Sequence, residues 1–223
     1  MRRVTFRFRL APNRRLLGIL YRLRRPLAVT DQRSSTLRDL SVFLLLVAIG
    51  VAGRWGQPEW CFTPTAAATI FAGWYFSRLG VAALVPIAIL GLSDLALEAH
   101  DNLGVMLATY AVMTAPVLFG RWFRNANGTA AAAVRLVLCG VLPATIFWIV
   151  SNFAVWEFQS DYEQSFAGLM RCYWMAVPFY RWMLAGDVFY LTLFVACAAL
   201  AGMPMVQLQR QPLQQQPGAP DRQ

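Results

Sequence analysis

Long blocks without a charged residue constrain this chain more than any other feature of its sequence. Residues 60–77, 103–120, 136–156 and 188–209 form uncharged blocks of 18, 18, 21 and 22 residues. A bilayer hydrocarbon core about 30 Å thick needs about 20 apolar residues per helix. The four blocks therefore predict four membrane-spanning helices.

Two shorter blocks, residues 40–53 and 79–93, hold 14 and 15 uncharged residues. These lengths also suit re-entrant or core segments. The chain has 20 arginines and no lysine, and six spans with a cytoplasmic N-terminus place 17 of them inside and 3 outside. Without the two short spans, Arg78 moves to the outside. The positive-inside rule thus favours an all-α polytopic protein with six transmembrane helices and both termini in the cytoplasm.

The composition separates a membrane domain from two polar ends. Hydrophobic residues make up 58% of the chain and charged residues 14%, against about 45–50% apolar residues in soluble domains. Eleven arginines precede Leu40. We predict an arginine-rich cytoplasmic arm (1–38), a membrane domain (39–206) and a disordered Gln/Pro-rich cytoplasmic tail (207–223). The arm is either an interfacial helix on anionic lipid or a disordered topogenic segment, and a mitochondrial presequence would have a similar composition.

No motif indicates metal binding or catalysis. The four cysteines, Cys61, Cys139, Cys172 and Cys197, lack CxxC spacing, and His100 is the single histidine. We therefore expect no metal, no cofactor and no nucleic-acid partner. The sequence has no nucleophile–base pair or phosphate-binding loop, so it favours a protein that is not an enzyme. Cys61 and Cys172 either form a disulfide near the outer face or serve as packing residues.

An aromatic and amide face is predicted near the outer end of the fifth span. Trp148, Asn152 and Trp156 recur every four residues and so share one helix face. Such a face suits a planar polar ligand. Alternatively, the tryptophans belong to an interfacial belt and Asn152 bonds a neighbouring helix.

A second polar group precedes the sixth span. Residues 172–190 are rich in aromatic residues, and Pro178 is expected to break the helix. Asp187 would then lie a turn or two below the outer surface and need a partner or a watery cavity, with Arg181 the nearest base in the sequence. We predict an outer-facing ligand site built from Asn152, Trp156, Tyr173, Arg181 and Asp187. The alternative is an interfacial belt with one ion pair and no cavity.

Ala48 and Ala52 form a small-xxx-small face on the first span. Small side chains let helix backbones approach closely. This face either binds a partner or packs inside the protein.

Several segments resemble an uncharacterised family of small bacterial membrane proteins. They are FTPTAAATIFAGWYF (62–76), LSD (92–94), SNFAVW (151–156), FAGLMRCYWMAVPF (166–179) and GDVFY (186–190), in a match from about residue 40 to about residue 200. The family is distantly similar to the substrate-binding S components of energy-coupling-factor vitamin transporters. That resemblance implies an S-component-like six-helix bundle, a small-molecule ligand at the outer face, and a coupling subunit with ATPases docked at Ala48 and Ala52.

These observations predict a multi-pass protein of the bacterial cytoplasmic (inner) membrane that contacts the lipid bilayer. Its expected function is the small-molecule-binding subunit of an energy-coupling-factor-like importer. The alternative is a non-transporting membrane scaffold or assembly factor.

The topology is testable by cysteine labelling in intact cells. An impermeant thiol reagent should label a cysteine introduced at Asp161, in a predicted outer loop, and not one at Asn127, in a predicted cytoplasmic loop. The reverse pattern would contradict the predicted orientation.

Overall fold

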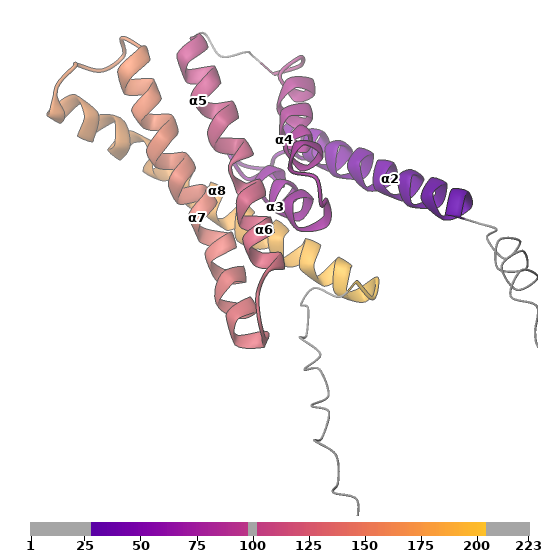
Figure 1. The fold of residues 1–223 in the computed structure, drawn as a ribbon. Helices are drawn as coiled ribbons and strands as arrows, with labels where there is room; N and C mark the ends of the chain where they lie inside the picture. Colours follow the sequence, from indigo (N-terminus) through magenta and orange to yellow (C-terminus); the bar gives the residue numbers. More distant parts are fainter. Residues whose placement is uncertain (1–27, 98–101, 204–223) are drawn as a thin grey trace, which may run out of the picture. The chain divides into compact units, whose positions relative to one another are not determined.

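The computed structural model describes the backbone of residues 28–97 and 102–203, and within these ranges the side chains from residue 36 onward. The described residues form helices joined by turns, with no strand among them, so the all-α prediction is confirmed (Figure 1). The helices are α2 (Ala28–Trp55), α3 (Thr65–Tyr75), α4 (Leu79–Ser93), α5 (Leu103–Thr114), α6 (Pro116–Arg124), α7 (Thr129–Phe158) and α8 (Phe166–Leu200). Most of the predicted arm and all of the predicted tail lie outside the described residues.

The chain divides into two units, Met1–Val42 and Phe43–Gln223. Helix α2 begins in the first unit and ends in the second. In the first unit, Ser41 Oγ donates to the carbonyl of Leu37 one turn earlier, at 2.9 Å. Helices α3 to α8 and their mutual contacts belong to the second unit.

Four helical stretches in the described part of the chain are long and apolar enough to cross a membrane. They are Thr36–Trp55, Leu103–Arg124, Thr129–Phe158 and Phe166–Leu200. The second of these contains both α5 and α6, which meet at Ala115. Helix α4, with 15 residues, is shorter. The structure thus supports a helical membrane protein, while the number of spans stays a prediction.

Helix α3 is shorter than the uncharged block at residues 60–77 predicted. It has 11 residues and begins directly after Pro64. A proline disfavours the helical conformation in the residue before it, and Cys61 has a positive φ of 70°, so the helix does not extend toward residue 60. Nine of the 11 residues are buried. Helix α3 therefore lies in the protein core, and α4 to α8 all contact it.

The predicted break at Pro178 is wrong. Helix α8 runs without interruption through Pro178 for 35 residues, a length of about 52 Å. Its first turn is capped by Ser165, whose Oγ accepts from the Gly168 N–H at 3.1 Å. Pro178 is exposed on the helix surface, and membrane helices tolerate an interior proline because the freed backbone groups find other partners.

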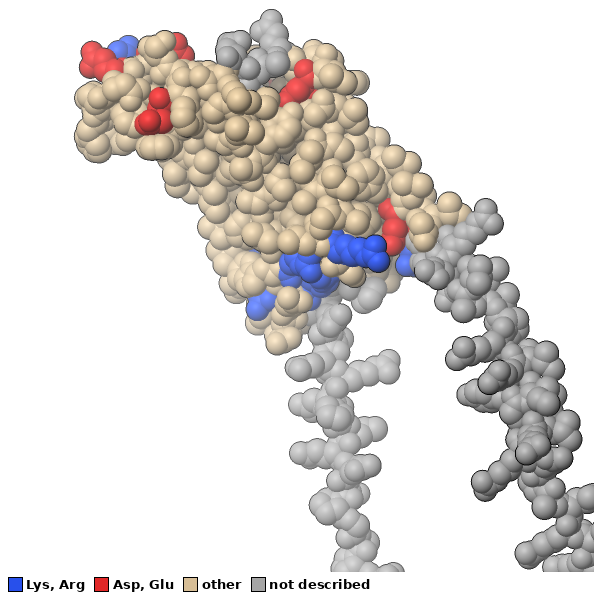
Figure 2. Space-filling model, turned by 45° about the horizontal axis from the view of Figure 1, so that its top comes forward, with Lys and Arg blue, Asp and Glu red and all other residues tan. Residues whose placement is uncertain are grey.

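Arginines gather where α6 ends and α7 begins. Arg121 and Arg124, in the last turn of α6, donate to the carbonyls of Ser77 and Phe76 between α3 and α4, at 3.1 and 3.2 Å. Arg135 of α7 lies over the Trp122 ring, 5.0 Å from its centroid. Figure 2 shows this group of basic side chains at one end of the molecule. We call this the arginine end.

At the other end of α4, a polar cluster around Asp94 joins the last turn of α2, the end of α4 and the interior of α5. Its Oδ1 accepts from Arg54 at 2.8 Å and its Oδ2 from Tyr110 at 2.9 Å. Trp55 Nε1 donates to the Ser93 carbonyl at 3.1 Å. The paired side chains are only 19% and 15% exposed. Asp94 thus holds three helices together through partly buried contacts. We call this end of the bundle the acidic end.

Helix α3 passes between these two ends. At its start, Pro64 packs against Gly53 in the last turns of α2, close to the acidic end. At its finish, the Trp74 carbonyl accepts from Arg124 at 3.3 Å. We call the residues before it the 56–64 segment. This segment packs between α2 and α8, because Pro64 lies against Gly53 of α2 and the Phe62–Thr63 backbone lies against Gly186 of α8.

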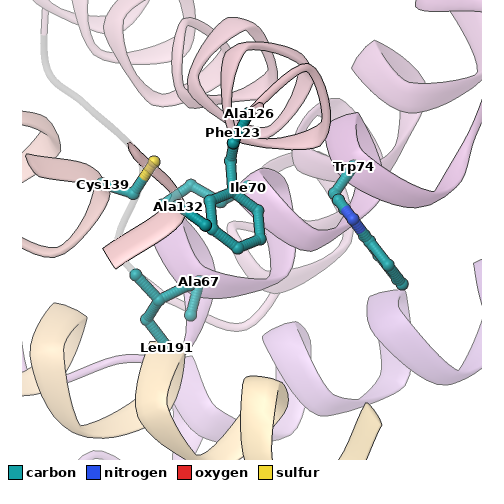
Figure 3. Close-up of a cluster of buried hydrophobic side chains, with 8 residues drawn as sticks. All are labelled: Ala67, Ile70, Trp74, Phe123, Ala126, Ala132, Cys139 and Leu191. Carbon is teal, nitrogen blue, oxygen red and sulfur yellow. The ribbon is translucent and has the colours of Figure 1, made fainter. Parts of the chain in front are cut away.

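Two glycines bring the backbones of α3 and α6 into direct contact. A Cβ on Gly73 would overlap the Val117 carbonyl, and a Cβ on Gly120 would overlap the Ile70 carbonyl. Side chains from α3, α6, α7 and α8 surround this contact. Figure 3 shows the cluster of Ala67, Ile70, Trp74, Phe123, Ala126, Ala132, Cys139 and Leu191.

Replacing Gly120 by alanine should destabilise the bundle. The added methyl group would meet rigid backbone, and overpacking a well-filled core costs about 1–3 kcal/mol. The free energy of unfolding in mixed detergent micelles measures this loss. Gly91→Ala in α4 is the matched control, because nothing lies within 4 Å of its added Cβ; it should be neutral or stabilise by up to about 1 kcal/mol. Equal stabilities of the two variants would contradict the close α3–α6 contact.

Candidate functional site

A cavity of about 170 Å³ lies between α7, α8 and the 56–64 segment. Its walls are formed by Cys61, Phe147, Trp148, Ser151, Asn152, Ala176, Phe179, Tyr180 and Met183. Four of the nine are aromatic, and no side chain with a formal charge at neutral pH is among them. The cavity is therefore mostly apolar with a few polar groups, which is typical of small-molecule sites.

The α7 wall carries the polar groups. Trp148, Ser151 and Asn152 share one face of the helix, because they are three and four residues apart. Ser151 Oγ donates to the Phe147 carbonyl, and Asn152 Nδ2 donates to the Trp148 carbonyl, each at 2.7 Å. The Asn152 side-chain oxygen and the lone pairs of Ser151 remain as acceptors. Trp148 Nε1 is buried and has no hydrogen-bond partner.

The Trp148 ring is held by two tyrosines of α8. Its centroid lies 4.9 Å from that of Tyr173 and 5.5 Å from that of Tyr180. Each tyrosine is tied back to α7, Tyr173 through a 2.8 Å bond to the Ile149 carbonyl and Tyr180 through a 3.0 Å bond with Thr145 Oγ1. The orientation of the unpaired Trp148 N–H is thus set by packing before any ligand binds.

The 56–64 segment contributes Cys61 to the cavity. Its N–H donates to Gln57 Oε1 at 3.0 Å, and its carbonyl accepts from the Thr63 N–H at 3.1 Å. A positive φ at a non-glycine residue is uncommon and costs on the order of 1–3 kcal/mol when the surrounding structure imposes it. The turn at Cys61 is therefore a strained part of the cavity wall.

The structure separates the five predicted ligand-binding residues. Asn152 lines the cavity, and Tyr173 supports it through Trp148. Trp156 donates to the Glu163 carbonyl at 2.9 Å, in the turn between α7 and α8. Arg181 is exposed, and its guanidinium lies 5.5 Å from the Trp182 ring centroid. Neither Trp156 nor Arg181 lines the cavity.

Asp187 is buried below the cavity and is not one of its lining residues. It lies one helical turn beyond Met183 on α8 and is 4% exposed. The backbone of Ala144, halfway along α7, lies near its carboxyl group. Its Oδ2 is buried without a partner. Asp187 and Arg181 form no ion pair, and Asn152 and Asp187 do not share the void that the sequence prediction required.

The cavity also includes residues outside the predicted set. Trp148 was recognisable from its spacing to Asn152. Phe179 and Tyr180 lie within the aromatic segment of α8, but their direction depends on the helix continuing through Pro178. Cys61 carried no local signal, because its position comes from the packing of a turn. Cys61 and Cys172 are free thiols, and Cys172 Sγ contacts the Asn152 carbonyl at 3.4 Å, so the structure contains no disulfide between them.

Ala48 and Ala52 are both exposed on α2. The opposite face of the same helix packs inward, where a Cβ on Gly50 would overlap the Ile89 side chain. The small-xxx-small face thus does not pack within the second unit. In the described residues, no group of three His, Cys, Asp or Glu side chains lies close enough to hold a metal ion.

The chain belongs to a family of unknown function, DUF6580, whose model matches residues 34–210. This match spans all the helices from α3 to α8 and most of α2. No curated protein and no solved structure matches the chain.

Proposed function

We propose that this protein is a membrane-embedded small-molecule-binding subunit whose site is the cavity between α7, α8 and the 56–64 segment. The observation that carries the proposal is that Trp148, one of the cavity-lining residues, has a buried indole N–H without a hydrogen-bond partner. Leaving a buried donor without a partner costs about 1–3 kcal/mol. A ligand that accepts this hydrogen bond removes the cost.

The cavity limits the ligand in size and charge. Cavities of about 150 Å³ hold a benzene-sized molecule, so a volume of about 170 Å³ suits a single ring. The ligand would accept from Trp148 and donate to Asn152 or Ser151. A neutral ligand is favoured, since no charged side chain lines the cavity.

The proposed topology has six crossings of the bacterial inner membrane, with both termini in the cytoplasm. Its support is that α3, although short, starts near the acidic end and finishes at the arginine end. The arginine end would face the cytoplasm, as the positive-inside rule requires. The cavity lies toward the acidic end, which would then be the outer face.

The exposed face of Ala48 and Ala52 is the proposed docking surface for a coupling subunit. In an energy-coupling-factor-like importer, such a subunit would link this chain to ATPases. The exposure of both alanines supports the idea that something outside the second unit covers them. A non-transporting scaffold would use the same face without needing a ligand.

A tryptophan substitution tests the cavity. We expect native mass spectrometry of the purified protein to detect a bound small molecule. Trp148→Phe should weaken its binding about five- to tenfold, because it removes one hydrogen bond of roughly 1 kcal/mol and keeps an aromatic ring. Trp174→Phe is the matched control, since Trp174 lies on α8 outside the cavity and is 76% exposed. A folded wild-type protein without ligand, or equal retention by both variants, would refute the proposal.

Replacing Ala48 or Ala52 by leucine tests the docking surface. Each larger side chain should reduce the ATPase activity that co-purifies with the tagged chain by about tenfold, since it holds the partner helix away. The melting temperature should be unchanged, because the sites are exposed. Ala196→Leu, an exposed alanine on α8, is the control. Co-purification of a partner without ATPase activity or ligand would favour the scaffold.

A further inference from the structure

The environment of Asp187 provides no countercharge for its carboxylate. Arg54 is in a half-buried ion pair with Asp94, and Arg181 is exposed. The charged side chains of α7, Arg135 and Glu157, lie nine and 13 residues along the helix from Ala144. The titratable groups Cys61 in the 56–64 segment, Cys139 on α7 and Tyr190 on α8 are neutral when protonated. Helix α3 contributes no acidic or basic side chain.

An ionised carboxylate is energetically unfavourable in such surroundings. A buried charge without a partner costs several kcal/mol. The Ala144 backbone lies near the carboxyl group, but Oδ2 is buried and has no hydrogen-bond partner. A proton on the carboxyl group removes the charge and turns the unpaired oxygen atom into a donor.

Near Ala144, helix α7 has a backbone carbonyl that lacks its helical hydrogen-bond donor. Pro143 lies inside the helix, one residue before Ala144. Because proline has no N–H, the carbonyl of Cys139 four residues earlier has no partner in the helix. A protonated carboxyl group near Ala144 would donate to a backbone oxygen of this kind.

The same carboxyl group is next to the turn that forms part of the cavity wall. Gly186 lies against the Phe62–Thr63 backbone, where an added Cβ would be 3.2 Å from Phe62 Cα. Cys61 lies within electrostatic range of both Arg54 and Asp187. A charge appearing on Asp187 would draw water or a cation toward this strained turn.

We propose that Asp187 is a proton-binding site that controls the 56–64 segment. The neutral acid keeps the Cys61–Thr63 turn packed on α8 and the cavity wall closed. Loss of the proton to water leaves a buried carboxylate, and the turn loosens to hydrate it. This proton loss changes the cavity wall and involves no ligand, so the proposal does not depend on the proposed transport function.

The first test compares the full-length wild-type protein with Asp187→Asn, which is neutral at every pH. The folded wild-type protein would bind a proton that the unfolded chain releases, so its stability must fall as the pH rises. From about pH 5 to about pH 9, its melting temperature should drop by at least about 3 °C more than that of D187N. Asp161→Asn is the matched control, because Asp161 is an exposed acid in the turn before α8; it should follow the wild type.

A second measurement needs no stable variant. Infrared spectra of the wild-type protein at neutral pH should contain the carbonyl band of a protonated carboxylic acid, which carbon-13 labelling of aspartate shifts. D161N should retain this band and D187N should lack it. Absence of the band from the wild type, or equal pH dependence of wild type and D187N, would overturn the proton site.

The labelling rate of Cys61 measures whether the protonation of Asp187 is coupled to the cavity wall. In proteins that keep Cys61 as their sole cysteine, the ratio of the maleimide reaction rate in the wild-type background to that in D187N should rise at least about threefold between about pH 5 and the pH at which the wild-type infrared band of the carboxylic acid disappears. The titration of the thiol itself is common to both proteins. An unchanged ratio would show that the proton does not move the turn.

Discussion

The backbone contact between α3 and α6 is the interaction on which the rest of the structure depends. Gly73 and Gly120 allow the two helices to approach until carbonyl groups occupy the space where side chains would otherwise stand. In a lipid-exposed protein, burial from water adds little between helices, and close packing supplies most of the association energy. Helix α3 is consequently enclosed on all sides by other helices, and nine of its 11 residues are buried.

The position of α3 determines how the preceding chain runs. Since α3 begins only at Thr65, the 56–64 segment must connect it to α2 without helical structure, and it packs against Gly53 and Gly186. This packing places Cys61 on the cavity wall and Phe62 against Gly186, the residue before Asp187. The cavity, the strained turn and the buried carboxyl group thus lie close together because helix α3 is short and buried.

Sequence reasoning succeeded where the signal was local. Three of the four long uncharged blocks, at 103–120, 136–156 and 188–209, fall on helices that can cross a membrane, whereas the block at 60–77 gave a short core helix. The four-residue spacing placed Trp148 and Asn152 on one face. It failed for Pro178, because whether an interior proline breaks a helix depends on the space around its ring and on partners for the freed carbonyl. It also grouped Arg181 with Asp187 from proximity in the chain, whereas one side chain points outward and the other is buried.

The amino-acid sequence by itself determined the membrane character, the helical class and the charge difference between the two ends of the bundle. These properties follow from composition and spacing within single segments, where lipid solvation and backbone hydrogen bonding act on each segment separately. Tertiary structure alone decided that α3 lies in the core, that the cavity lies between α7 and α8, and that Asp187 has no countercharge. Each of these depends on which surfaces meet, and residues more than a hundred positions apart, such as Phe62 and Gly186, are brought together only by the packing of the whole bundle.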